Sequence, residues 1–307
     1  MAGHHQKQSE TSGKRMLVTM LLNFSITLIE IIGGTMSGSL SLISDALHNF
    51  SDGIAIIVSY VALRLSQKPK TSSYTFGLKR AQILAAILNS AVLLAISIYL
   101  VREAVSKLLH PQVIDGSLML IVASFGLAAN LIGTWLLHRG AESNMNVRSA
   151  YLHLLADAVS SVAVILGALA IKFFNQYWVD PILTLLIAAY VGWESWKIIQ
   201  QATKVLMLKV PGSISMDVLE TALEEIPGVC DAHHIHLWQV DDRDIHFEAH
   251  IGVEDALLSA TATIAAQIEQ RLHEKFGINH VTLQFEAGSC VTGNHRLAEN
   301  SRQAGGS

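Results

Sequence analysis

Hydrophobic residues are arranged along the chain in six long, nearly uninterrupted stretches separated by short polar segments. The stretches cover residues 16–36, 40–63, 81–101, 118–137, 149–173 and 181–199. A helix needs roughly 20 mostly apolar residues to cross the hydrocarbon core of a bilayer, and the breaks between the stretches carry turn-forming Gly, Pro and Ser residues. The pattern predicts an α-helical membrane domain of six transmembrane helices over residues 16–209, preceded by a polar tail at residues 1–15.

The pattern changes after residue 210, where Pro211-Gly212 interrupts the helical periodicity. Helical spacing covers residues 215–225 and 260–276, and strand-like patterns cover 232–240, 245–253 and 280–285. The resulting order α-β-β-α-β predicts a small α+β domain over residues 210–287. The polar, Gly- and Ser-containing residues 288–307 are typical of a disordered tail.

The composition is typical of a membrane protein, because only 15% of the residues are charged, against about 25% in a soluble protein. The net charge of -4 gives no basic field for nucleic acid. Basic residues gather in alternate connections: Lys7, Lys14 and Arg15; Arg64, Lys68, Lys70, Lys79 and Arg80; Arg139 and Arg148; Lys204 and Lys209. With an even number of spans, this bias predicts that both termini are cytoplasmic.

The two cysteines, Cys230 and Cys290, lie outside the apolar stretches and form no Cys-x-x-Cys pair. On the cytoplasmic side of a membrane they are expected to be isolated reduced thiols, with a redox or metal-ligand role as the alternative.

Two of the apolar stretches carry the same polar motif, His-x-x-x-Asp, as His48 with Asp52 and His153 with Asp157. Residues four apart lie one above the other on a helix, and ionisable groups at membrane depth indicate function. If the two pairs face each other, two imidazoles and two carboxylates surround one point, which is the donor set of a tetrahedral zinc site. The alternative is two separate His–Asp hydrogen bonds that serve helix packing.

Further polar residues lie in the spans. Asp45 is one helical turn before His48, where it could orient the imidazole through its other ring nitrogen or pair with a neighbouring helix; the sequence leaves both open. Glu30 is a candidate for the metal path. Helix–helix hydrogen bonding is the alternative for Glu30 and the expected role of Asn23, Asn89 and Asn130 in the first, third and fourth spans.

Taken together, these motifs resemble the cation diffusion facilitator family of metal transporters, over about residues 15–286. The motifs are Ser-Asp-Ala-x-His-x-x-x-Asp at 44–52, His-x-x-x-Asp at 153–157, Tyr-Thr-Phe-Gly at 74–77 and His-His-Ile-His-Leu-Trp at 233–238. The resemblance implies a homodimer, proton-coupled metal efflux, and a ferredoxin-like, metallochaperone-like cytoplasmic domain. It also implies that His48, Asp52, His153 and Asp157 form the transport site, with a preference for zinc because position 48 is histidine.

In the C-terminal domain, the resemblance implies that His233, His250 and Glu286 are cytoplasmic zinc ligands, with His280 as a further candidate. The alternative for each histidine is a strand-surface residue without a metal. His234, His236 and His246 are expected on the opposite or an adjacent face, because strand side chains alternate.

The sequence departs from the family pattern at two places, which bear on the number of metal sites and on the type of transporter. Tyr74 and Leu78 stand where some bacterial members have histidines, so no metal site is expected between the second and third spans. The connection at residues 139–148 is short and lacks the His-rich insertion of many eukaryotic members, which favours a bacterial-type transporter of the inner membrane. Zinc is the expected cargo, with cadmium and cobalt as further ions, exchanged for protons by alternating access.

Two other classes of protein compete with a transporter. An intramembrane metalloprotease needs a catalytic base beside its ligands, usually in His-Glu-x-x-His, but the one His-Glu pair, His273-Glu274, lies in the C-terminal domain. A membrane-anchored metal sensor would need ligands in that domain alone.

Overall fold

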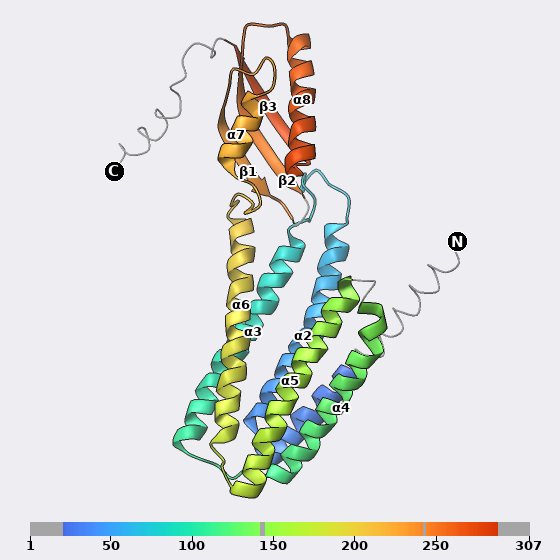
Figure 1. The fold of residues 1–307 in the computed structure, drawn as a ribbon, viewed down its shortest axis with the longest axis vertical. Helices are drawn as coiled ribbons and strands as arrows, with labels where there is room; N and C mark the ends of the chain where they lie inside the picture. Colours follow the sequence, from blue (N-terminus) through green and yellow to red (C-terminus); the bar gives the residue numbers. More distant parts are fainter. Residues whose placement is uncertain (1–20, 142–144, 242–243, 288–307) are drawn as a thin grey trace, which may run out of the picture. The chain divides into compact units, whose positions relative to one another are not determined.

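The computed structural model describes residues 21–141, 145–241 and 244–287. The predicted tails at 1–15 and 288–307, and the first residues of the first predicted span, lie outside this part. One compact unit comprises the chain up to Arg64 together with Leu84–Gln200, and the other comprises Leu65–Ile83 and the chain from Gln201 onward. Each unit is described by itself (Figure 1).

The first unit is a bundle of long apolar helices. Five of them are long and apolar enough to span a membrane: α2 (Leu40–Ser66), α3 (Ala81–Leu109), α4 (Gly116–Ala141), α5 (Met145–Phe174) and α6 (Val179–Leu206). Before them, the described part of the chain begins with the helix Leu21–Ser37, which coincides with most of the first predicted span. The prediction of an α-helical membrane domain is therefore confirmed.

The helices are longer than the apolar stretches that predict them. The stretch at residues 81–101 becomes α3, Ala81–Leu109, which continues through Arg102 and Lys107. Hydropathy measures the length that lies in hydrocarbon, whereas a helix continues into the interface wherever good helix formers follow. The extra turns therefore carry the charges that flank each span.

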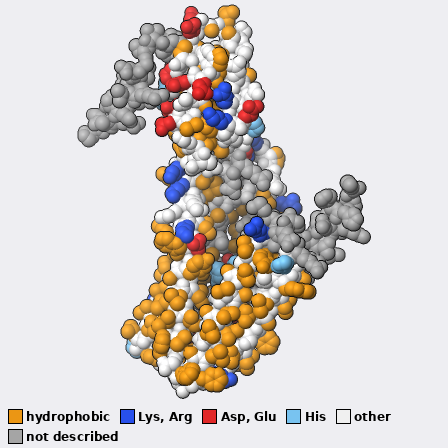
Figure 2. Space-filling view, in the orientation of Figure 1, with side chains coloured by type: hydrophobic (Ala, Val, Ile, Leu, Met, Phe, Trp, Pro, Cys, Tyr) orange, Lys and Arg blue, Asp and Glu red, His pale blue; other side chains and the backbone are white. Residues whose placement is uncertain are grey.

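Helix α2 lies between two packing groups. Leu42 of α2 belongs to a core with residues of α4 and α5, such as Met119 and Val164. Leu40 of α2 belongs to a second core with Leu100 of α3 and residues of α6. The face of the helical unit seen in Figure 2 carries mostly hydrophobic side chains, as expected of a surface in contact with lipid.

A buried carboxylate joins the beginning of α2 to the beginning of α6. Asp180 of α6 is fully buried. Its Oδ1 accepts hydrogen bonds from Ser39 Oγ at 2.7 Å, Ser41 N at 3.1 Å and Ser41 Oγ at 2.5 Å, and its Oδ2 accepts one from Leu40 N at 2.7 Å. The free N–H groups at the start of α2 are thus paired by a residue about 140 positions away in the sequence.

The second unit contains the predicted α-β-β-α-β domain: α7 (Met216–Glu224), β1 (Asp231–Gln239), β2 (Ile245–Val253), α8 (Leu258–Phe276) and β3 (His280–Ala287). The sheet order is β1-β2-β3, with β1 antiparallel and β3 parallel to β2. Leu219 and Leu223 of α7 and Ile268 and Leu272 of α8 pack on the inward side chains of the strands, such as Phe247. The prediction of a small ferredoxin-like α+β domain is confirmed.

Two features next to the strands were not predicted from the hydrophobic pattern of the sequence. Helix α8 ends at Gly277, whose left-handed backbone (φ 67°) favours glycine. Cys230, directly before β1, is disulfide-bonded, so the prediction of two isolated reduced thiols is wrong; Cys290 lies outside the described residues.

Residues 65–83, the connection between α2 and α3, group with the C-terminal domain in the second unit. Lys79 forms an ion pair with Asp244 in the turn before β2. The ring of Phe76 contacts the imidazole of His246 edge-on, with ring centroids 5.4 Å apart. The Tyr-Thr-Phe-Gly motif therefore supplies an aromatic contact to the sheet.

Candidate metal sites

Helices α2 and α5 present the four polar side chains at membrane depth. Each His-x-x-x-Asp pair lies within one helix, so its two side chains are one turn apart on the same face. Within α2, Nε2 of His48 is 3.5 Å from Oδ2 of Asp52, and within α5, Nε2 of His153 is 3.5 Å from Oδ2 of Asp157. The local geometry thus follows directly from the four-residue spacing.

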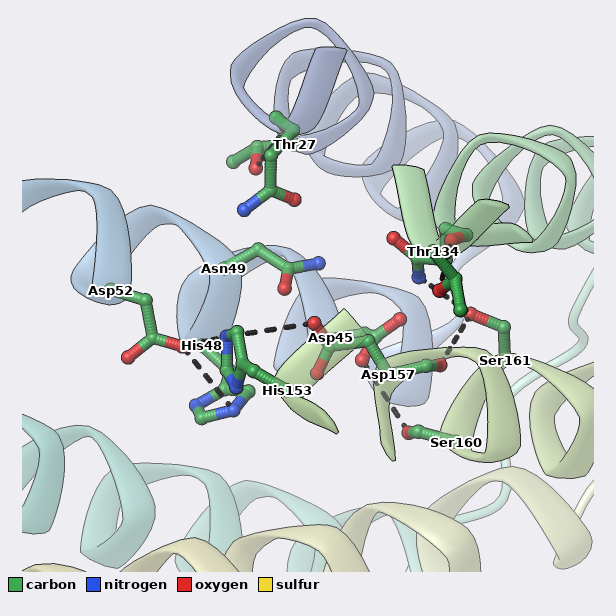
Figure 3. A network of polar contacts seen from close by, with 12 residues as sticks. Thr27, Asp45, His48, Asn49, Asp52, Thr134, His153, Asp157, Ser160 and Ser161 are labelled. Carbon is green, nitrogen blue, oxygen red and sulfur yellow. Dashed lines mark hydrogen bonds and ion pairs between the residues drawn. The ribbon is translucent and has the colours of Figure 1, made fainter. Parts of the chain in front are cut away.

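The structure brings the two pairs together, as Figure 3 shows. Nε2 of His153 on α5 is 3.1 Å from Oδ2 of Asp52 on α2, which is the shortest of the three His–Asp contacts. The imidazoles of His48 and His153 meet edge-on, with ring centroids 5.9 Å apart. The two pairs are therefore not independent intrahelical pairs, because Asp52 faces a histidine on each helix.

The distances can be compared with those around a tetrahedral metal ion. Bonds of about 2.0–2.1 Å place neighbouring ligand atoms about 3.3 Å apart. Three of the six pairs among the four residues measure 3.1–3.5 Å, and the four are not among the described groups whose ligand atoms all lie close to one another. Oδ2 of Asp52 and Oδ2 of Asp157 are buried and make no hydrogen bond. Buried carboxylate oxygens normally have hydrogen-bond partners, and these two have only the contacts with His48 and His153, which suits atoms that accept a cation.

Asp45 lies beside this group and is almost completely buried. Ser160 of α5 donates a hydrogen bond to its Oδ1 at 3.4 Å, and Asp157 is near enough to interact with it electrostatically. Of the two roles that the sequence leaves open, the structure therefore shows pairing with a neighbouring helix. Ser160 was not identified from the sequence, because a serine in a helix carries no signal of its partner.

A second group of ligand-type side chains lies on the sheet of the C-terminal domain. Among the described residues, His233, His250 and Glu286 form the one group of three whose ligand atoms all lie within 4.8 Å of one another. Nε2 of His233 is 3.3 Å from Oε2 of Glu286, and Nδ1 of His250 is 2.8 Å from Oε1 of the same carboxylate. Two imidazoles and a carboxylate suit zinc and its neighbours in the first transition series.

The charge of this second group fits a cation. Burial acts to raise the pKa of Glu286, but His250 and then His233 outweigh it, and the net effect lowers the pKa of this carboxyl. Glu286 is therefore ionised at neutral pH and can coordinate metal without first losing a proton.

The sequence analysis missed Asp231, which lies two residues before His233 on the same face of β1. Its Oδ2 is 2.8 Å from Nδ1 of His233, so it holds the imidazole with Nε2 directed at Glu286. Carboxylates of this kind orient metal-binding histidines. The alternation of side chains along the strand was the signal that could have identified it.

A bulge in β1 changes the expected positions of two other histidines. The register shifts between His233 and His236, and His234 has a left-handed backbone with φ 52°. As a result the ring of His234 lies 4.8 Å from that of His250 and 4.9 Å from that of His236, centroid to centroid. His234 was expected on the opposite or an adjacent face from alternation alone, but its ring lies beside that of His250 because a bulge interrupts the alternation of the strand.

His280 lies at the opposite end of β3 from Glu286, and the structure does not bring it to the three ligands. It pairs in register with His246 of β2, and their rings are 4.4 Å apart. Burial and then the charge of His280 lower the pKa of His246. Lys79 and Lys70 also lower this pKa, whereas Asp244 raises it. His280 thus belongs to a different histidine pair.

Apolar helices with two groups of ligand-type side chains are typical of a membrane protein that transports metal. The family model described as "Cation efflux transmembrane domain" matches residues 16–207, and the one described as "Cation efflux protein, cytoplasmic domain" matches residues 210–288. The chain belongs to the cation efflux family, also called the cation diffusion facilitators. It is a metal cation transporter of the membrane and not an enzyme.

Named relatives match over nearly the whole chain. The "Zinc transporter ZitB" of Pectobacterium atrosepticum is 35% identical over 94% of this chain and 90% of that protein. The "Cadmium, cobalt and zinc/H(+)-K(+) antiporter" of Bacillus velezensis is 34% identical over 94% of this chain and 93% of that protein. The "Metal cation efflux system protein CzcD" of Cupriavidus metallidurans is 33% identical over 94% of this chain and 91% of that protein.

Proposed function

We propose that this protein exports zinc in exchange for protons, and that His48, Asp52, His153 and Asp157 bind the zinc during transport. The observation that carries this proposal is the approach of His153 on one helix to Asp52 on the other, at 3.1 Å. It joins two intrahelical pairs into one group of nitrogen and oxygen donors at membrane depth. Ionisable groups at that depth are costly unless they serve an ion path.

Zinc is favoured as the cargo by the donors. Two imidazole nitrogens and two carboxylate oxygens are typical of zinc, whereas all-oxygen sites suit manganese, magnesium or calcium. Two carboxylates also balance the charge of a divalent ion, which matters in a medium of low dielectric constant. The names of two relatives include zinc, cadmium and cobalt, which supports the same group of ions for this chain.

The exposure of the ligands indicates the side from which metal enters. On α5 the side chain of His153 is 42% exposed and that of Asp157, one turn further on, is 5% exposed. On α2 the side chain of Asp52 is 22% exposed, whereas Asp45, two turns earlier, is 3% exposed. On α5 the site opens toward the end that the basic residues assign to the cytoplasm, whereas on α2 the two ligand side chains are equally exposed, 23% for His48 and 22% for Asp52. We infer a conformation that faces the cytoplasm.

A transport site must also release its ion, so the ligands have to separate. We infer that α2 and α5 shift relative to each other, which lengthens the contact between Asp52 and His153 and keeps each intrahelical pair intact. Because packed helix interfaces have discrete arrangements, such a shift can alternate between two states. Metal and protons then stabilise different states by binding them with different affinities.

Proton exchange follows from the chemistry of the ligands. A histidine binds metal only as the neutral base, and a carboxylate only as the anion, so protons and metal compete for the same four side chains. Metal displaces protons on the cytoplasmic side, and protons displace metal on the opposite side. The name of the Bacillus velezensis relative includes a proton counter-ion, which supports this coupling.

The C-terminal domain is proposed to tune transport and not to perform it. We infer that His233, His250 and Glu286 hold a zinc ion, with Asp231 orienting His233, and that the working protein is a homodimer in the bacterial inner membrane with both termini in the cytoplasm. The match of residues 210–288 to the cytoplasmic domain of the family supports this arrangement. Bound metal would favour one state of the dimer.

Metal flux tests the proposal directly. The purified protein is placed in liposomes with an imposed pH gradient, and uptake of zinc, cadmium, cobalt and manganese is compared with that of empty liposomes. We expect zinc uptake that rises with the pH gradient. Zinc uptake equal to that of empty liposomes would contradict transport and would favour a membrane-anchored sensor.

The selectivity of the site is expected to depend on His48. His48→Asp leaves one nitrogen and three oxygen donors and adds a negative charge, so the preference for zinc over manganese should fall by about tenfold, which corresponds to about 1.4 kcal/mol. Competition uptake at one pH measures the ratio. Equal ratios in the variant and the wild-type protein would place discrimination elsewhere. Asp115→Asn, at the exposed start of α4, is the control.

The domain site is expected to depend on His250. His250→Ala removes one nitrogen donor and a partner of Glu286, so the zinc affinity of the isolated segment 210–307 should fall by about 10–100-fold or more. The hydrophobic core of this domain lies entirely within the segment, so it can be studied alone by calorimetry. His273→Ala, on α8, should bind zinc as the unaltered segment does. If the unaltered segment binds no zinc, the inferred domain site is incorrect.

A further inference from the structure

Glu30, in the Leu21–Ser37 helix, is a buried carboxyl that the proposed metal site does not use. Its side chain is 1% exposed. Nδ2 of Asn49, which follows His48 on α2, donates a hydrogen bond to Oε2 of Glu30 at 3.5 Å. Glu30 is therefore linked to the helix that carries two of the metal ligands without contacting a ligand itself.

Helix α4 leaves space for this carboxyl. A Cβ atom added at Gly126 would lie 2.5 Å from Oε1 of Glu30, so alanine there would force the carboxyl to move from this position. The absence of a side chain at residue 126 lets α4 approach Glu30 closely and excludes water from that side. The position of the carboxyl is thus built by three helices.

The surroundings of Glu30 disfavour a negative charge. Within the part of the chain that the structure describes, no Lys, Arg or His nitrogen lies within 4.0 Å of its carboxyl. The ionisable groups that act on it electrostatically are Asp45 of α2 and Asp157 of α5, both acidic. An anion buried without a cation is strongly disfavoured, so Glu30 in this conformation is the neutral acid.

The neutral acid also explains an unpaired atom. Oδ1 of Asn49 is buried and has no hydrogen-bond partner. The two ends of an amide are assigned from their partners and can be exchanged by a half-turn of the side chain. After that turn, the O–H of a protonated Glu30 can donate to Oδ1 of Asn49, in place of the bond that Nδ2 now donates to Oε2.

We propose that Glu30 carries a proton of the exchange cycle, separately from the four metal ligands. The inference rests on the proposed zinc–proton exchange. When Zn²⁺ binds near Asn49, its charge favours the anion, the Glu30 O–H bond breaks, and the proton passes to water on the cytoplasmic side. The anion then accompanies the metal through the transition, and Glu30 takes up a proton again after the metal leaves.

Counting protons tests this role. Glu30→Gln keeps the shape of the neutral acid and cannot release a proton. Zinc is added to the purified protein by calorimetry in two buffers of different ionisation enthalpy, which gives the protons released per zinc bound. We expect about one proton fewer for Glu30→Gln than for the wild-type protein, with zinc still bound, whereas Ser90→Ala, a buried polar position in α3, should match the wild type. A purely structural role for Glu30 would leave the count unchanged.

The outcomes separate this inference from the function on which it rests. An unchanged count in Glu30→Gln, while the wild-type protein releases protons, overturns the role of Glu30 alone. A wild-type protein that binds and transports zinc without releasing protons overturns the exchange and this inference together. Should Glu30→Gln fail to fold, Asn49→Ala keeps the carboxyl and removes its partner. Its zinc flux should reach half-maximum at a different pH from wild type, and an unchanged profile would contradict the proposal.

Discussion

Asp157→Ala is expected to lower zinc flux by about 100-fold or more while the protein still folds. Loss of a residue that only orients a metal ligand costs 10–100-fold in affinity, and loss of a direct ligand costs at least as much. The side chain of Asp157 is 5% exposed and its Oδ2 has no hydrogen bond, so removing it breaks no pairing except that with His153. Zinc uptake into liposomes, together with the elution volume of the detergent-solubilised protein, measures both effects.

The same experiment tests whether two helices build one site. Asp52→Ala should lose as much flux as Asp157→Ala, and the double variant should be no worse than either single one, because residues that act as a unit are not additive. Glu194→Ala is the matched control, since Glu194 lies on a spanning helix and, among the described residues, forms an ion pair only with exposed Lys197. Either single variant transporting at the wild-type rate would exclude the four-ligand site.

The sequence predicted most of the fold because lipid imposes strict rules. Hydrophobic length identifies a spanning helix, and the five long apolar helices lie where the apolar stretches predicted them. Strand β2, Ile245–Val253, has the bounds expected from its alternation. Helix ends were less predictable, because charged helix formers such as Arg102 continue a helix beyond the hydrocarbon without a change of conformation.

The candidate sites were predictable where they depend on spacing within one element. The four-residue spacing fixed each His–Asp pair, and the repetition of the motif suggested that the pairs meet; that they bind metal stays a prediction. His234 could not be placed, because its left-handed backbone and the bulge it creates interrupt the alternation on which the prediction rested. His280 was grouped with Glu286, but six residues of strand separate them by about 20 Å.

Contacts between residues far apart in the sequence were not predictable. Asp180, directly before the last predicted span, was not among the candidate residues of the sequence analysis, although its carboxylate accepts four hydrogen bonds. Nothing in its own neighbourhood in the sequence indicates that its partners are Ser39, Leu40 and Ser41. Only the structure shows that the side chain of Asp180 accepts hydrogen bonds from the N–H groups at the start of α2.

Asp180→Ala is therefore expected to destabilise the helical unit severely. The substitution leaves two buried N–H groups at the start of α2, and the hydroxyls of Ser39 and Ser41, without their acceptor. Removing one partner from a buried charged network costs about 3–5 kcal/mol, because each buried donor left unpaired costs about 1–3 kcal/mol. Asp180 is fully buried, so the donors it leaves do not face bulk water. The measurement is the temperature at which half of the detergent-solubilised protein is lost from its size-exclusion peak.

Asp115→Ala is the comparison that shows how much of the loss of stability is due to burial of the carboxylate. Asp115 also accepts hydrogen bonds at the start of a helix, from Ser117 N at 2.9 Å and Leu118 N at 3.1 Å, but it is exposed. Water can pair with the N–H groups that it leaves, so the loss should be about 1 kcal/mol, as for other exposed helix caps. Asp180→Asn should fall between the two, because its amide keeps one acceptor and turns a donor toward the remaining donors. Equal midpoints for Asp180→Ala and Asp115→Ala would show that the hydrogen bonds to Asp180 do not hold α2 and α6 together.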